Sequence, residues 1–143
     1  MRPSDIRPIA RFPDWRTRLV RYLCEVAHLP FEDGVHDCAL FFAGALEAMT
    51  GFDVAAPYRG RYSTLRGGFR IVRRDGYRDH VAWVQSHLET KPVALARQGD
   101  GAVVETPDGD ALGIVQGAGI YVLLPSGLAL VPLTAARCAL EVS

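Results

Sequence analysis

The chain has 143 residues, a length typical of one folded domain. Hydrophobic residues make up 49% of it and charged residues 22%, which excludes an intrinsically disordered tail and a collagen-like repeat. No apolar run reaches the roughly 20 residues of a membrane-spanning helix, so we expect no membrane partner. Arg and Pro occur in the first twelve residues, where a secretory signal has its apolar stretch, and this predicts folding in a cytoplasm.

The net charge is zero, but the charges are unevenly distributed. Residues 1–78 contain thirteen Arg and nine acidic residues, a net +4, and residues 79–143 contain three basic and seven acidic residues, a net −4. An electrostatic binder of nucleic acid usually carries a positive excess over its whole domain, so this distribution disfavours a nucleic-acid partner. Three cysteines, an odd number, fit reduced thiols better than a disulfide framework.

The first half of the chain predicts helices. Residues 15–26 place apolar side chains at helical spacing, with Asp14 positioned to cap the helix and Pro30 positioned to end it. Two shorter helices are predicted over residues 61–75 and 79–88.

The strongest predicted helix covers residues 37–51. Asp37 can cap its start, and Gly51 supplies its C-terminal stop. Its interior is apolar nearly all round, and a helix with so little polar surface is normally the buried, central one.

From Pro92 onward the sequence changes to short apolar runs separated by turn residues. Short strands at about ten-residue spacing predict a small antiparallel sheet or half-barrel. Helices followed by strands are typical of an α+β fold, here one domain over residues 1–143 with a helical half (13–91) and a β half (92–142). The predicted strands are residues 93–96, 102–106, 112–116, 120–124 and 128–132, with 139–142 as a candidate sixth.

Cys38 is the position where chemistry is most strongly indicated. It follows Asp37 in the first turn of the central helix, where the helix dipole and unpaired backbone N–H groups favour a thiolate and can bind an oxyanion. The nucleophilic Cys of a papain-like hydrolase is built in this way. The alternative is that Cys38 is a small buried hydrophobic residue, the commoner role of a lone Cys in an apolar helix.

A resemblance to a known family covers roughly residues 13–142. In their order along the chain, five segments resemble the small NlpC-type cysteine peptidase domains of long-tailed phage tail operons. They most resemble a degenerate branch usually labelled as a phage or prophage domain of unknown function. The resemblance implies a papain-like, NlpC-type fold, in which N-terminal helices, including the Cys38 helix, pack on the sheet. The segments are residues 36–41 (HDCALF), 50–53 (TGFD), 58–62 (YRGRY), 98–104 (QGDGAVV) and 111–117 (ALGIVQG).

The base is missing from the pattern. In an NlpC-type peptidase a His begins the Gly-Ile strand and acts as the base, and the resemblance places Ala111 at that position. A thiolate needs a positioned imidazole, both to hold the ion pair and to return a proton to the leaving amine. Alanine can do neither, so the resemblance implies a vestigial nucleophile at Cys38 and an inactive domain.

Two other histidines are candidates for a substitute base. His36 lies two residues before Cys38, and side chains two apart at a helix start point away from one another. His80 lies on a predicted helix that no sequence pattern places over Cys38. An active cysteine hydrolase that cuts peptidoglycan peptides with a relocated base is the alternative hypothesis. There is no CxxC, HExxH or paired Cys–His spacing, so we expect neither a metal nor a cofactor.

Residues 59–78 contain seven Arg and a single acidic residue, with aromatic residues interleaved. One interpretation is a nucleic-acid or phosphate surface, and another is a solvated helix face. The third is a surface for a protein partner, because Arg and Tyr are enriched in interface cores. The candidate partner-binding residues are Arg59, Arg61, Tyr62, Arg66, Arg70 and Arg73.

The resemblance also implies a biological role, as a structural or assembly component of a phage or prophage tail tip, in the baseplate or hub region. The expected partners are other tail proteins, namely the hub, distal tail, tape-measure or fibre-base proteins. The expected location is the virion, after assembly in the host cytoplasm. A nucleic-acid-binding accessory protein that uses residues 59–78 is the second alternative.

Overall fold

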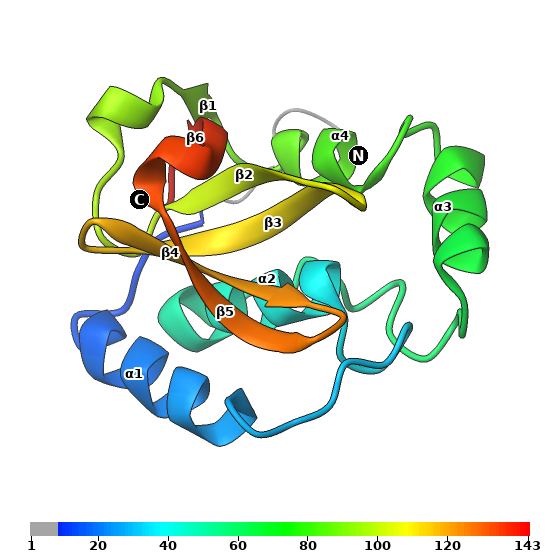
Figure 1. Ribbon diagram of the computed structural model, residues 1–143, viewed down its shortest axis with the longest axis horizontal. Coiled ribbons are helices and arrows are strands. Elements are labelled where there is room, and N and C mark those ends of the chain that lie inside the picture. The colour runs from blue at the N-terminus through cyan, green and yellow to red at the C-terminus, as the bar shows by residue number, and fades with distance from the viewer. Residues whose placement is uncertain (1–8) are drawn as a thin grey trace.

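The computed structural model describes residues 9–143 and confirms the α+β fold (Figure 1). Residues 1–8, on which the predicted lack of a secretory signal mainly rests, lie outside this description. In the described part of the chain, no helix is long and apolar enough to cross a membrane. The helices are α1 (Trp15–Val26), α2 (Cys38–Thr50), α3 (Leu65–Arg74) and α4 (His80–Gln85).

The strands form one six-stranded antiparallel sheet in the order β1-β6-β2-β3-β4-β5. Three hairpins join β2 to β5 in sequence, and β6 returns to lie between β1 and β2. The strands are β1 (Thr90–Lys91), β2 (Gly101–Thr106), β3 (Gly109–Gln116), β4 (Gly119–Leu124), β5 (Gly127–Pro132) and β6 (Ala136–Leu140).

Helix α2 is the central helix, as predicted. It packs against β3 and β4 on one face of the sheet, and α1 packs against α2 (Figure 1). Phe41, Phe42 and Leu46 on this helix are fully buried. Asp37 caps its start, and Gly51 ends it in the left-handed conformation with a φ of 79°. This packing fixes the first residue of α2, Cys38, beside the sheet.

Two helices are shorter than predicted. The helix expected over 61–75 is α3, which begins later because the side chain of Thr64 caps it. Its two glycines do not break it, and one has a packing role: a Cβ on Gly68 would come within 3.1 Å of the Tyr62 ring. The helix expected over 79–88 is α4, which ends at its sixth residue.

The strand predicted over 93–96 is wrong. Val93–Leu95 forms a 3₁₀ turn, and β1 occupies that edge of the sheet instead. Pro92 explains the difference, because its φ of −60° suits the start of a turn and its nitrogen has no hydrogen for a strand ladder. The candidate strand over 139–142 is β6, which lies inside the sheet and pairs with two neighbours.

A buried polar network ties both ends of the described chain to the sheet. The carboxylate of Asp100, which is fully buried, forms an ion pair with Nζ of Lys91 at 2.7 Å and accepts a hydrogen bond from Nη2 of Arg11 at 3.2 Å. The backbone N–H groups of Arg97 and Val142 donate to it at 2.7 and 3.1 Å. Two cations and two amides therefore compensate the buried charge.

Candidate active-site pocket

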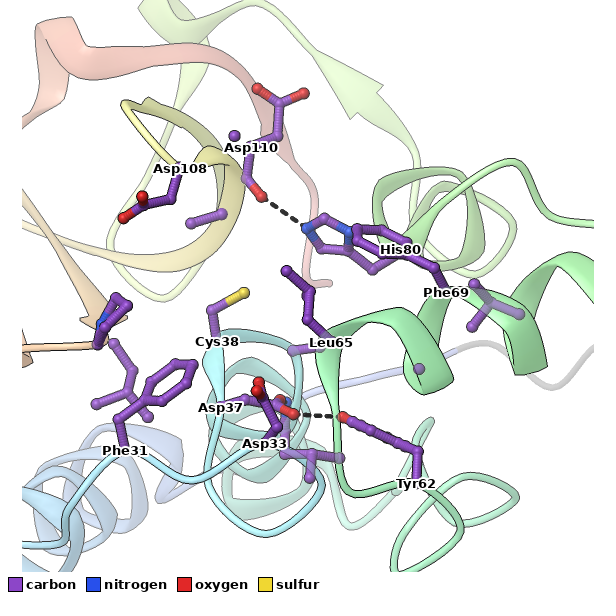
Figure 2. Close-up of a pocket in the computed structure, with 18 of the residues that line it drawn as sticks. Phe31, Asp33, Asp37, Cys38, Tyr62, Leu65, Phe69, His80, Asp108 and Asp110 are labelled. Atoms are coloured by element: carbon purple, nitrogen blue, oxygen red, sulfur yellow. Dashed lines mark hydrogen bonds between the residues drawn. The ribbon is translucent and has the colours of Figure 1, made fainter.

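A pocket of about 430 Å³ opens at the N-terminal end of α2 (Figure 2). Cys38 and Ala111 both line it, so the two positions that the resemblance pairs lie together. His80 lines it as well, from the start of α4. Aromatic side chains make up much of the wall, namely Phe31, Tyr58, Tyr62, Phe69 and Trp83.

Asp37 organises the base of this pocket. Its carboxylate accepts from the N–H of Leu40 at 2.9 Å, which is the predicted helix cap, and from the N–H of Gly34 at 3.0 Å. It also accepts a hydrogen bond from the hydroxyl of Tyr62 (Figure 2). Gly34 has a φ of 82°, and a Cβ there would collide with the carbonyl oxygen of Tyr62. Asp37 therefore holds the loop before α2, the helix start and the Tyr62 segment together.

The thiol of Cys38 points into the pocket (Figure 2), but its environment does not favour ionisation. Burial raises the pKa of Cys38 to about 11, and the carboxylates of Asp37 and Asp33 also act to raise it. The backbone N–H groups of Leu112 and Ala39 act in the opposite direction and are outweighed. The helix start favours a thiolate at Cys38, but burial outweighs this effect and favours the protonated thiol.

The pocket is acidic. Asp33 and Asp37 lie side by side near the thiol, and Asp108 and Asp110 come from the turn before β3 and its start (Figure 2). Burial, followed by the negative charge of Asp37, raises the pKa of Asp33. Among the described residues that line the pocket, His80 is the only one that can become positively charged. Reactive cysteines need electropositive surroundings, and this site has the opposite.

His80 is held as a hydrogen-bond donor. Its Nε2 lies 2.7 Å from the carbonyl oxygen of Asp110 (Figure 2), and its ring packs against Phe69 with 5.6 Å between centroids. A carbonyl oxygen only accepts, so Nε2 carries a proton and donates it to this hydrogen bond. To accept a proton from Cys38 through Nε2, the ring would have to give up its bond to β3.

His36 lies outside the pocket. Its ring meets Phe41 edge-on, with 6.4 Å between centroids, and its Nε2 is buried with no hydrogen-bond partner among the described residues. Burial lowers the pKa of His36, although the charge of Asp37 acts to raise it. The side chain faces a different groove, between α1 and α2. The structure thus brings Cys38, Ala111 and His80 together and leaves His36 out.

The arginines of residues 59–78 differ in their surroundings. Arg59 pairs with Asp53 at 2.8 Å, and Arg73 donates to the carbonyl oxygen of Arg78 at 3.1 Å. Arg66 is exposed on α3. The hydroxyl of Tyr62 donates a hydrogen bond to Asp37 in the Cys38 pocket. A second groove, beside the first, is lined by Arg61, Arg70 and Arg74.

Several residues that shape these two sites are not among the residues predicted from the sequence. Asp33 lies in a polar segment that indicates only a turn, and Trp83 lies on a helix whose place over the pocket no local pattern reveals. Arg74 was left out of the candidate binding residues, although its spacing of four from Arg70 puts both on one helix face. That spacing is the one signal in the sequence that points to Arg74.

Comparisons with known proteins agree with this geometry. A family model described as a domain of unknown function, DUF6950, matches residues 10–142. Among solved structures, the crystal structure of the NlpC/p60 domain of the peptidoglycan hydrolase SagA is similar, with a TM-score of 0.56 and 17% sequence identity over 89% of this chain and 95% of that chain. No curated protein matches. At this identity the likeness shows the fold alone, and that fold is NlpC-like.

Proposed function

The chain belongs to the DUF6950 family and has an NlpC-like fold, and from this premise we propose that it is a catalytically inactive relative of the cysteine peptidases with that fold. The observation that carries the proposal is that Ala111, at the expected position of the base, lines the same pocket as Cys38, whose pKa burial raises to about 11.

Peptide hydrolysis by a cysteine needs three things at one point in space: a thiolate, N–H donors for the oxyanion, and an imidazole that carries the proton to the leaving amine. The start of α2 supplies backbone N–H groups near Cys38. A thiolate is disfavoured because burial raises the pKa of Cys38, and Ala111 supplies no imidazole at the expected position of the base. Two of the three requirements are unmet.

Digestion of purified cell walls tests the proposal. We expect the protein to release no soluble peptidoglycan fragments, alongside an active NlpC/p60 enzyme as positive control. Activity that disappears in Cys38→Ala would overturn the proposal.

The same assay tests the second candidate, an active hydrolase with a relocated base. One observation favours it: His80 lines the same pocket as Cys38. If His80 were the base, His80→Ala and Cys38→Ala would both abolish release of fragments, whereas His36→Ala would leave it unchanged because His36 faces another groove.

We propose that the domain acts instead as a structural component of a phage or prophage tail tip, in contact with other tail proteins. The support is the sequence resemblance carried by the five segments from residue 36 to residue 117, together with a pocket ill-suited to catalysis. Mass spectrometry of purified particles should detect the protein. Deletion of its gene should give particles with incomplete tails by electron microscopy, and complementation with Cys38→Ala should restore them. Absence from purified particles, or normal tails without the gene, would contradict this role.

A further inference from the structure

A second groove, of about 450 Å³, lies between the loop over residues 57–64 and helix α3. Three arginines line it: Arg61 from the loop, and Arg70 and Arg74 from successive turns of the helix. The other side chains along it include the apolar and aromatic residues Pro57, Tyr58, Tyr62 and Ile71. The groove is therefore basic and partly apolar, whereas the Cys38 pocket beside it is acidic.

The charge of this groove is not compensated within the described chain. Arg70 and Arg74 form no ion pair with any described residue, and Arg61 donates only to the carbonyl oxygen of Pro57, at 3.1 Å. Among the described residues that line the groove, Asp75 is the one acidic residue. Its carboxylate accepts a hydrogen bond from the Tyr58 hydroxyl at 2.7 Å.

Of the other four arginines in this segment, Arg59 and Arg78 lie within ion-pair distance of an acidic residue, whereas Arg66 and Arg73 form no ion pair with a described residue. Arg59 pairs with Asp53, and Arg78 lies 3.7 Å from Asp79. Like charges four residues apart on a helix repel each other, so Arg70 and Arg74 gain from an anion placed between them. Three of the five arginines of this segment that have no ion pair with a described residue therefore line the groove.

We propose that this groove binds an acidic segment of a partner protein. The planar donor fork of Arg pairs with carboxylates through two parallel hydrogen bonds, so three arginines on one groove suit a segment with two or three Asp or Glu side chains. Tyr62 and Ile71 offer apolar area that such a segment can cover, and the combination of Arg and Tyr is characteristic of protein interfaces.

The charge distribution favours a protein segment over nucleic acid. The chain is neutral, and its second half has a net charge of −4, so a long polyanion would be repelled beyond the groove itself. Asp75 adds a negative charge at the groove wall. A short acidic segment needs only the local pairing that three arginines supply.

The groove and the Cys38 pocket share two walls, Tyr58 and Tyr62. The Tyr58 ring meets Trp83 edge-on, with 5.5 Å between centroids, so binding in the groove should change the fluorescence of Trp83. This readout does not involve hydrolysis. The proposal can therefore fail or succeed independently of whether the protein digests peptidoglycan.

The test measures anisotropy of fluorescein-labelled hexaglutamate with the full chain, at low and high salt, and compares labelled single-stranded DNA of equal length. We expect the peptide to bind more tightly than the DNA. Arg70→Glu with Arg74→Glu should weaken peptide binding by about tenfold or more, because it reverses the charge of the groove.

The matched control is Arg16→Glu with Arg21→Glu, which changes the net charge equally at two exposed arginines of α1, outside the groove. This control should weaken binding by less than about threefold, through long-range attraction only. If reversal prevents folding, judged by circular dichroism, Arg70→Ala with Arg74→Ala takes its place and should also weaken binding. Equal losses in both double variants, tighter binding of DNA, or no peptide binding at low salt would overturn the proposal.

Discussion

Asp100 and Asp37 are both buried carboxylates that accept several hydrogen bonds, but the charges around them differ. Asp100 meets Lys91 and Arg11 in addition to two backbone amides. Asp37 meets only neutral donors, the backbone of Leu40 and Gly34 and the hydroxyl of Tyr62. The carboxylate of Asp33 lies beside it in the pocket (Figure 2).

The difference distinguishes a cluster that stabilises the fold, around Asp100, from the candidate active site beside Asp37. Around Asp100 the charge is compensated, so the cluster holds the chain ends and the sheet together. Around Asp37 the negative charge is left over, and it adds to the burial that keeps Cys38 protonated. A cysteine at a helix start is therefore reactive only where its surroundings agree with the helix dipole, and here they do not.

The largest effect is expected at the compensated site. Asp100→Ala leaves two largely buried cations and two buried N–H groups without their acceptor, so the free energy of unfolding should fall by about 3–5 kcal/mol. Urea denaturation measures it. Asp14→Ala, which removes an exposed pair with Arg18, is the control and should change stability little. Similar stability of the two variants would show that the Asp100 cluster does not hold the fold.

The next largest effect is expected from adding the missing base. Ala111→His places an imidazole in the pocket that holds Cys38, and a nearby cation lowers a thiol pKa. In a Cys24→Ser, Cys138→Ser background, alkylation by iodoacetamide near neutral pH should speed up by about tenfold. Val35→His, at an exposed position outside the pocket, should have no effect. An unchanged rate in Ala111→His would mean that residue 111 is not the base position.

A smaller effect is expected from removing the uncompensated charge. Asp37→Asn keeps an oxygen that can accept from Leu40 but loses the negative charge, so the pKa of Cys38 should fall from about 11 by roughly one unit. Alkylation rate against pH measures the change. Asp33→Asn should lower the pKa less, since its charge acts on the thiol less strongly than that of Asp37. An unchanged pKa in Asp37→Asn would mean that the charge of Asp37 does not contribute to the raised pKa of Cys38.

The parts of the fold that sequence predicts well are those set by local pattern. Helix α2 has an N-cap at Asp37, a stop at Gly51 and an apolar interior, and each of these signals lies within the helix or at its end. The hairpin strands β2 to β5 are bounded by glycine turns. The sequence also places Ala111 and Cys38 in one pocket, although through a family resemblance rather than through local chemistry.

The parts of the fold that the sequence does not predict depend on contacts between distant segments. No local signal joins Tyr62 to Asp37, which are 25 residues apart, or inserts β6 between β1 and β2. The sign of the Cys38 pKa shift also depends on tertiary structure: the dipole is local to the helix, whereas the burial that outweighs it comes from the surrounding pocket.

The smallest effect is expected at Cys38 itself. Truncating a small, protonated thiol in Cys38→Ala should lower the free energy of unfolding by on the order of 1 kcal/mol near pH 8. The pKa of this thiol is raised to about 11 in the folded chain, so its proton is held more tightly there than in the unfolded chain. The stability that it contributes is therefore fully present below about pH 9 and is lost as pH rises toward about 11.

The difference in stability between Cys38→Ala and the unmodified chain should consequently shrink between about pH 9 and pH 11, as followed by urea denaturation at several pH values. Burial also raises the pKa of Tyr22, Tyr58 and Tyr62, but these residues are present in both proteins and their contribution cancels in the difference. Cys24→Ala, at an exposed thiol, is the control, and its difference from the unmodified chain should stay constant. A constant difference for Cys38→Ala as well would mean that Cys38 titrates as in the unfolded chain. The pocket would then not raise the pKa of its thiol.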